Sequence, residues 1–157
     1  MNVGGWLLWG FAGTVVLTTI IAGTQALGLT RLNIAYLLGT MFTGNRDRAK
    51  LIGVILHLAL GWLFALVYAA AFQSWGASWW RGALIGAVHS AFLLMVGMSV
   101  LPAIHPRMAS ETEGPTSKRQ LEPPGFVALN YGMGTPIALV LAHVVYGTIL
   151  GAFYRYA

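Results

Sequence analysis

Three histidines, His57, His89 and His143, lie within strongly apolar segments of the sequence. An ionisable side chain is costly in such a segment and usually has a function. Two of them begin the same pattern: "HLALGWLFALVY" and "HVVYGTILGAFY" each place a glycine four residues and a tyrosine eleven residues after the histidine. Both spacings are close to whole turns of an α-helix with about 3.6 residues per turn. The pattern therefore predicts a stripe of histidine, glycine and tyrosine along one face of each of two helices.

Several roles are open to these histidines. His57 and His143 could ligate haem iron from two parallel helices, and together with His89 they could bind a divalent metal. They could also transfer protons or handle a substrate. As neutral imidazoles they would instead form hydrogen bonds between helices, each worth about 1 kcal/mol in a bilayer. The chain has no cysteine, and its four acids lie outside the apolar segments. We therefore expect hydrogen bonding and no cofactor, with haem or a divalent metal as the alternative.

The composition predicts that these helices lie in a membrane. Apolar residues make up 57% of the 157 residues and charged residues only 8%, whereas soluble domains have about 25% charged residues. A helix needs about 20 mostly apolar residues to cross a bilayer. The sequence predicts an all-α polytopic membrane protein, with residues 1–157 forming one domain. Its four transmembrane helices are expected at about 3–27, 51–72, 82–101 and 136–153.

The charges predict the orientation of the chain. Seven of the nine basic residues fall in the loops at about 28–50 and 102–135, and only Arg81 and Arg155 lie on the other side. By the positive-inside rule both loops are cytoplasmic and both termini are not. This distribution explains the net charge of +5 by topology and lipid headgroups, so we do not expect nucleic-acid binding. The residues predicted to contact lipid or a partner are Arg46, Arg48, Lys50 and Arg107.

The two predicted loops differ in character. "LGLTRLNIAYLLGTMF" has apolar residues at helical spacing, which predicts an amphipathic helix that lies in the interface or dips into the membrane. The segment from Pro102 to Pro136 contains all six prolines and has no helical or strand period, so we expect an irregular loop. No nucleophile elbow precedes Ser110 there, and no residue is predicted to be catalytic.

The repeated stripes predict a duplicated helix pair. His57, Gly61 and Tyr68 match His143, Gly147 and Tyr154. Both histidines lie about eight residues, or roughly 12 Å, from the cytoplasmic end of their helix. Parallel repeats of this kind are related by an axis along the membrane normal. Small residues permit close helix packing in lipid, and the residues predicted to pack helices together are Gly61, Tyr68, Gly82, Gly86, Gly147, Gly151 and Tyr154.

A second polar feature lies on the first predicted helix. Thr14, Thr18, Thr19 and Thr24 could line a polar face together with Gln25. Hydroxyl groups on membrane helices more often bond to carbonyls of their own helix, and that is the prediction here.

Read in order, "YLLGTMF", "HLALGWLFALVYAAAF" and "HVVYGTILGAFY" resemble small four-helix inner-membrane proteins from uncharacterised bacterial families, of the kind described as domains of unknown function. The resemblance implies a four-helix protein of the bacterial inner membrane and no particular activity.

These observations predict a non-enzymatic accessory or assembly subunit that packs against other membrane proteins or against itself. The alternative is a membrane protein that binds haem or a metal through its histidines. A small transporter or channel is a second alternative, against which the lack of an intramembrane carboxylate counts. The partner, any solute or lipid ligand and the oligomeric state are left open by the sequence.

Overall fold

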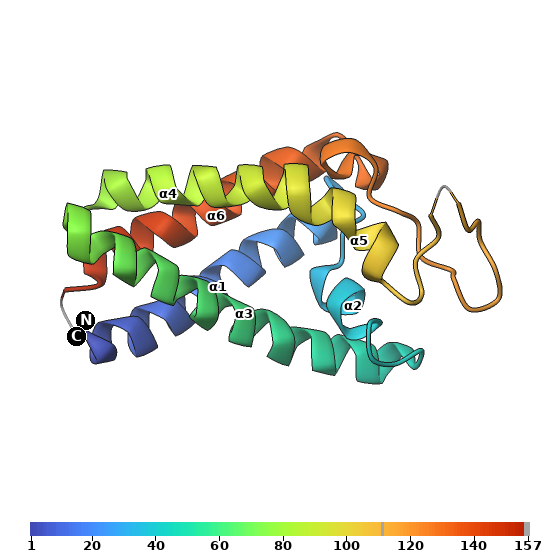
Figure 1. Cartoon of the computed structure of the whole chain (residues 1–157), viewed down its shortest axis with the longest axis horizontal. Helices are drawn as coiled ribbons and strands as arrows, with labels where there is room; N and C mark the ends of the chain where they lie inside the picture. The colour runs from blue at the N-terminus through green and yellow to red at the C-terminus, as the bar shows by residue number, and fades with distance from the viewer. Residues whose placement is uncertain (111, 156–157) are drawn as a thin grey trace.

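The computed structural model describes residues 1–110 and 112–155, which form a bundle of four long helices with shorter elements at one end (Figure 1). Four segments are long and apolar enough to cross a membrane: Val3–Ala26, Arg46–Trp75, Trp79–Ile104 and Gly134–Phe153. The prediction of an all-α, multi-pass membrane protein is confirmed. In chain order the elements are α1 (Val3–Ala26), α2 (Ile34–Gly39), α3 (Arg46–Trp75), α4 (Trp79–Phe92), the π-helical turn η1 (Leu93–Gly97), α5 (Met98–Ile104), the 3-10 turn η2 (Phe126–Tyr131) and α6 (Gly134–Phe153).

The two ends of the bundle are distinct. Both termini and the turn between α3 and α4 lie at one end, here called the terminal end (Figure 1). The opposite loop end carries α2, α5 and the loop that precedes η2. At the terminal end Asn2 caps α1 by accepting a hydrogen bond of 3.0 Å from the Gly5 amide. The Asn2 amide also donates to the Tyr154 hydroxyl at 2.8 Å, so the start of α1 is joined to the end of α6.

Helix α1 packs against both α3 and α6. Its contact with α3 depends on Gly10, where a Cβ would lie 3.0 Å from atoms of both Ala65 and Trp62. Two indoles reinforce this contact. Trp6 donates from Nε1 to the carbonyl of Trp62, and Trp62 donates from Nε1 to the carbonyl of Leu7, each at 2.9 Å. These bonds satisfy both indole N–H groups, which would otherwise lack an acceptor in lipid.

Helices α4 and α6 make the most extensive contact between long helices. A Cβ built on Gly82 would overlap the carbonyl oxygen of Gly147, and one on Gly86 would overlap that of His143. Gly151 likewise lies against α4, so backbone touches backbone at each of these positions. We call this contact the glycine interface. It is the close approach that small residues allow between helices in lipid.

The short helix α2 lies against the first turns of α3. Gly39 contacts the carbonyl of Ala49, and Gly53 contacts the carbonyl of Ala35. The segment predicted as an amphipathic helix is therefore helical at Ile34–Gly39 and is folded onto α3. Helix α3 itself begins at Arg46, before the predicted apolar boundary, because the Asn45 side chain caps it by accepting from the Arg48 amide at 3.0 Å.

The third membrane segment is not one regular α-helix. The π-helical turn Leu93–Gly97 separates α4 from α5. Beyond α5, the segment predicted as an irregular loop has one isolated bridge between Met108 and Leu121 among its described residues. Its last part forms the 3-10 turn η2, which leads into α6.

Candidate intramembrane ligand site

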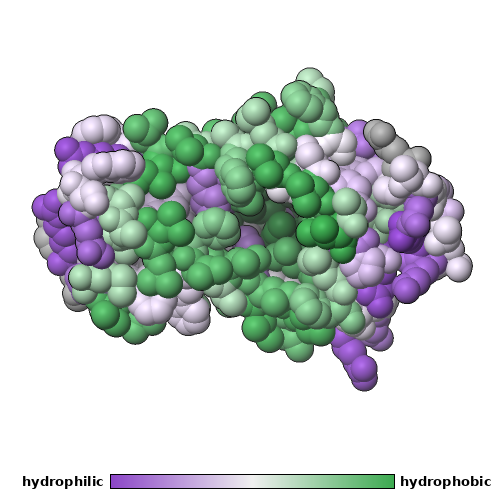
Figure 2. All heavy atoms as spheres, viewed as in Figure 1, coloured by the Kyte–Doolittle hydropathy of each residue, from purple (hydrophilic) through white to green (hydrophobic). Residues whose placement is uncertain are grey.

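Helices α3 and α4 diverge from their connecting turn and enclose a cavity of about 200 Å³ between them. We call it the α3–α4 cavity. Figure 2 shows a hollow at this place, surrounded by the apolar surface of α3 and α4. It therefore opens within the part of the bundle that faces lipid. Every membrane segment and α2 contribute to the lining, which consists of Thr14, Leu17, Ile21, Ile34, Leu37, Leu38, His57, Leu60, Gly61, Phe64, His89, Leu93, Gly97, Met98, Leu101, Leu139, His143 and Tyr146.

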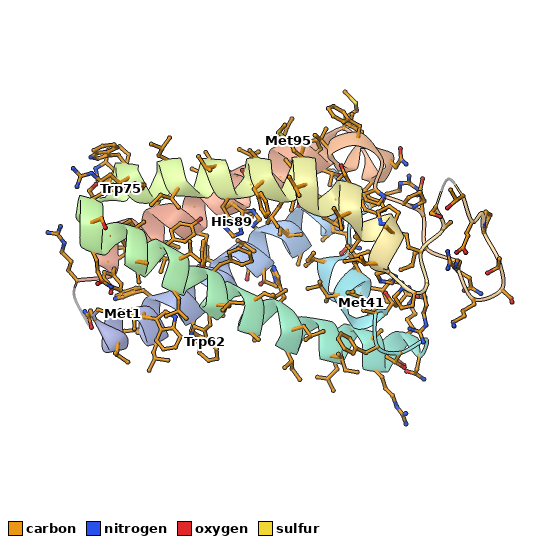
Figure 3. The ribbon with its side chains drawn as sticks, viewed as in Figure 1. Met1, Met41, Trp62, Trp75, His89 and Met95 are labelled. Carbon is orange, nitrogen blue, oxygen red and sulfur yellow. The ribbon has the colours of Figure 1, made fainter. Side chains whose placement is uncertain are left out.

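The structure brings all three intramembrane histidines to this cavity. His89 points from α4 into the interior of the bundle (Figure 3). Its ring lies edge-on to that of His143, with 4.8 Å between the ring centroids. The Phe64 ring of α3 covers the His89 ring at 4.2 Å. His57 of α3 lines the same cavity, so histidines from α3, α4 and α6 face one space whose other lining residues are mostly apolar.

Each histidine uses its Nδ1 atom in a hydrogen bond. His57 is 3.0 Å from the Thr18 hydroxyl of α1, and His89 is 3.2 Å from the Tyr68 hydroxyl of α3. His143 is 2.7 Å from the carbonyl of Leu139 on its own helix. Two of the three bonds thus connect helices, as expected of intramembrane histidines. The Nε2 atom of His89 is buried and has no hydrogen-bond partner among the described residues.

Tyr146 is a site residue that the repeated stripe did not identify. It is buried beside the cavity and donates its hydroxyl to the carbonyl of Gly61 at 2.6 Å, which connects α6 to α3. Its ring lies edge-on to Tyr68 at 5.3 Å. Tyr146 follows His143 by three residues, so both lie on one helix face. This three-residue spacing is the sequence signal that could have identified Tyr146.

The two stripes have unequal roles. Tyr68 bonds to His89 beside the cavity, whereas Tyr154 lies at the terminal end and accepts from Asn2. Gly61 lies against the Thr14 side chain of α1, whereas Gly147 belongs to the glycine interface. The same three residue types therefore lie at or beside the cavity on α3 and mainly pack helices together on α6.

The threonines of α1 bond to their own helix, as predicted. Thr14 donates to the carbonyl of Gly10 and Thr18 to the carbonyl of Thr14, both at 2.7 Å. Thr19 and Thr24 form equivalent bonds. The oxygen of Thr18 is then left to interact with His57.

His105 connects α5 to α2 at the loop end of the bundle. It is only 2% exposed, and its Nε2 donates to the carbonyl of Leu37 in α2 at 3.0 Å. Its Nδ1 accepts from the Arg107 amide at 3.1 Å. His105 directly follows α5, so this bond joins the α4–α5 side of the cavity to the α2–α3 side. Burial lowers the pKa of His105, and the nearby Arg107 charge lowers it further, although the Leu37 carbonyl opposes the shift.

The basic residues predicted to contact lipid or a partner lie at the loop end. Arg46, Arg48 and Lys50 are exposed around the start of α3. Arg107 is half-buried and donates to the carbonyl of Thr40 at 2.6 Å. Together with Lys118 it lines a separate polar cavity of about 360 Å³. Figure 2 shows hydrophilic surface at this end of the molecule.

No family model matches this chain. Comparison with curated proteins and with solved structures likewise finds no match. Within residues 1–110 and 112–155, no three histidine or acidic side chains are grouped so as to hold a metal ion. The interpretation of the cavity therefore depends on its own geometry.

Proposed function

We propose that this protein is a non-enzymatic accessory component of the membrane that binds a small apolar molecule from the bilayer in the α3–α4 cavity. The observation that supports this most is the position of the cavity within the lipid-facing surface. A dry cavity of about 150 Å³ in another protein binds benzene. A volume of about 200 Å³ therefore accommodates a ring or a short length of chain, and the open side leaves room for the rest of the molecule.

The composition of the cavity supports binding rather than catalysis. Ligand pockets are mostly apolar, with a few polar groups that fix the orientation of the ligand. Here the three histidines are such groups, and the chain has no carboxylate in the interior of its membrane segments. The π-helical turn Leu93–Gly97 contributes Leu93 and Gly97 to the wall. Single π turns within α-helices occur frequently at functional sites.

Binding by the wild-type protein tests this proposal directly. The protein is placed in phosphatidylcholine nanodiscs, and saturable binding of a radiolabelled alkylbenzene is measured against empty nanodiscs. Gly97→Leu should abolish binding, because its side chain enters the cavity and the nearest atom to a Cβ there is 3.5 Å away. Gly23→Leu is the matched control, since a Cβ at Gly23 meets nothing within 4 Å and the residue is outside the cavity. Equal binding by both variants would reject the proposal.

The accessory role is the second part of the proposal. Large apolar side chains are exposed on every membrane segment, and in the membrane they face lipid, other subunits or further copies of this chain. We expect purification from native membranes in mild detergent to retain a partner or an oligomer. A lone monomer with no co-purifying partner would count against this role.

We also propose that the loop end is cytoplasmic, in a bacterial inner membrane. The support is the concentration of seven of nine basic residues in the two loops. Because the chain lacks cysteine, single cysteines introduced at the exposed positions Ser117 and Ser74 report each side of the membrane. A membrane-impermeant thiol reagent applied to intact cells should label the Ser74 position alone. Labelling of the Ser117 position alone would reverse the orientation.

Haem or metal binding is the second candidate function. His57 and His143 both use Nδ1 in hydrogen bonds, and metal-ligating histidines usually engage their second nitrogen in this way. An absorption spectrum and metal analysis of protein purified from native membranes test it. A haem band or about one metal per chain, lost in His57→Phe, would favour this candidate over binding of an apolar molecule.

A further inference from the structure

The hydrogen bonds around the cavity determine which ring nitrogens carry protons. The Thr18 hydroxyl has one proton, and it is donated to the carbonyl of Thr14. The Thr18 oxygen can therefore only accept, so the Nδ1 of His57 must be the donor. The partner of the His143 Nδ1 is a carbonyl, which also only accepts. Both rings thus carry their proton on Nδ1.

A neutral imidazole has a single N–H group, so its other nitrogen is an acceptor. No carboxylate lies in the interior of the membrane segments to balance a charged imidazole, and an unpaired charge there is costly. His57 and His143 are therefore neutral, and each has an acceptor at Nε2. Neither of these two atoms has a hydrogen-bond partner among the described residues.

In His89 the proton lies on the other ring nitrogen, so its free Nε2 atom is a donor. If the Tyr68 hydroxyl donates to its Nδ1, both groups of that bond are satisfied and the proton of His89 lies on Nε2. If Nδ1 donates instead, the Tyr68 proton and the Nε2 lone pair both lack partners. The first arrangement leaves one unsatisfied group rather than two, and buried groups without partners are costly. The buried, unpartnered Nε2 of His89 is therefore an N–H donor.

The cavity consequently offers two acceptors and one donor among apolar walls. A hydroxyl group satisfies the His89 donor and one of the two acceptors, because it accepts one hydrogen bond and donates its single proton. A ketone or an ether has no proton to give to His57 or His143. A carboxylate would meet two lone pairs, and an ammonium group would meet the N–H of His89.

We infer that the ligand is a neutral lipophilic alcohol or phenol, whose hydroxyl lies among His57, His89 and His143. Its apolar part lies along Phe64, Leu93 and Met98, which line the same cavity. This inference rests on the proposed function, since it names the chemical class of molecule bound at that site.

A matched set of probes tests the inference on the wild-type protein in phosphatidylcholine nanodiscs. The probes are para-octylphenol, its methyl ether and the methyl ketone para-octylacetophenone. They share an apolar body, and only the phenol can donate a hydrogen bond. We expect the phenol to bind about tenfold more tightly than the other two, the effect of roughly one hydrogen bond. His143→Phe should reduce this preference to below threefold. Leu141→Phe, on the exposed face of the same helix, should retain it.

The possible results distinguish the chemical class of the ligand from the existence of the site. Saturable binding with no preference for the phenol would overturn the inference while leaving a lipophile site in place. Absence of saturable binding by all three probes would overturn the proposed function as well. Stoichiometric Zn²⁺ binding that excludes the phenol would also overturn the inference, because the two Nε2 acceptors would then be metal ligands. The wild-type comparison holds even if the His143 variant does not fold.

Discussion

Helix α4 has two neighbours, and it contacts them in opposite ways. Towards α6 it presents Gly82 and Gly86, and the two backbones touch. Towards α3 it presents His89, which meets the Phe64 ring and the Tyr68 hydroxyl. In lipid no hydrophobic effect drives two apolar helices together, so packing depends on how closely their surfaces fit. Small residues produce the glycine interface, whereas the larger side chains His89, Phe64 and Tyr68 lie between α3 and α4.

The cavity also marks a departure from the predicted duplication of the helix pair. If α1–α3 and α4–α6 were equivalent pairs, the contact between α1 and α6 would have its counterpart between α4 and α3. Helix α1 packs closely along α6, with a Cβ at Gly13 lying 3.0 Å from the Tyr146 ring. Helices α3 and α4 have almost no close backbone approach. The cavity thus lies at a place where the two halves of the chain differ.

The largest effect is expected from a side chain in the glycine interface. Gly147→Leu places atoms where the Gly82 carbonyl lies, so α4 and α6 must separate. Overpacking of this kind costs about 3 kcal/mol, which would be measured as a lower free energy of unfolding in detergent titrations. Gly23→Leu, in open space on α1, should change it by less than about 1 kcal/mol. Equal losses would mean that the interface is not tightly packed.

A smaller loss is expected on the cavity side of the bundle. Tyr146→Phe removes the hydroxyl that donates to the Gly61 carbonyl and leaves the ring in place. The cost should be about 1 kcal/mol, the value of one intramembrane hydrogen bond. The same detergent titration measures it. A loss of stability larger than that of Gly147→Leu would mean that the Tyr146–Gly61 hydrogen bond stabilises the bundle more than the glycine interface does.

Filling the cavity should cost the least stability. In Gly97→Leu the added Cβ meets only a side-chain carbon of Leu93 at 3.5 Å, an ordinary contact, and the rest of the side chain has the volume of the cavity beside it. We expect the free energy of unfolding to change by less than about 0.5 kcal/mol, as at tolerant positions, while ligand binding is lost. A destabilisation as large as that of Gly147→Leu would show that no free space exists at this position.

Acid should weaken the structure locally around His105, at the loop end of the bundle. Folding lowers the pKa of His105 from its unfolded value near 6.5. The unfolded state therefore binds more protons, so the stabilising contribution is complete above about pH 6.5 and is lost as the pH falls towards the folded value. The His105 Nδ1 atom accepts a hydrogen bond from the backbone N–H of Arg107, so a proton on Nδ1 would break that bond.

Hydrogen exchange of the Arg107 amide measures this effect. Between pH 7 and pH 5, after correction for the intrinsic exchange rate, its protection should fall by about tenfold or less. In His105→Gln the protection should be independent of pH, because no group titrates there. Unchanged protection in the wild type would mean that protonation of His105 does not disrupt the hydrogen bond from the Arg107 amide.

Much of the fold was accessible from sequence because membranes impose simple rules. Apolar length identified four membrane segments, and the small residues Gly82, Gly86, Gly147 and Gly151 marked positions that the structure places in helix contacts. The histidines stood out because polar groups are rare in such segments. The cavity was not accessible, since it depends on the divergence of α3 from α4 and on a π turn that no spacing indicated.

The sequence by itself determined the class of the protein, its four membrane segments and the polar residues available inside them, because hydropathy and helical spacing are local properties. Only the tertiary structure decided that His57, His89 and His143 meet in one cavity, and that the two similar stripes serve different contacts. It also decided which ring nitrogens remain free, since the Thr18 hydroxyl and the Leu139 carbonyl fix the proton positions. These properties depend on which helix faces which, and several packings are compatible with one apolar sequence.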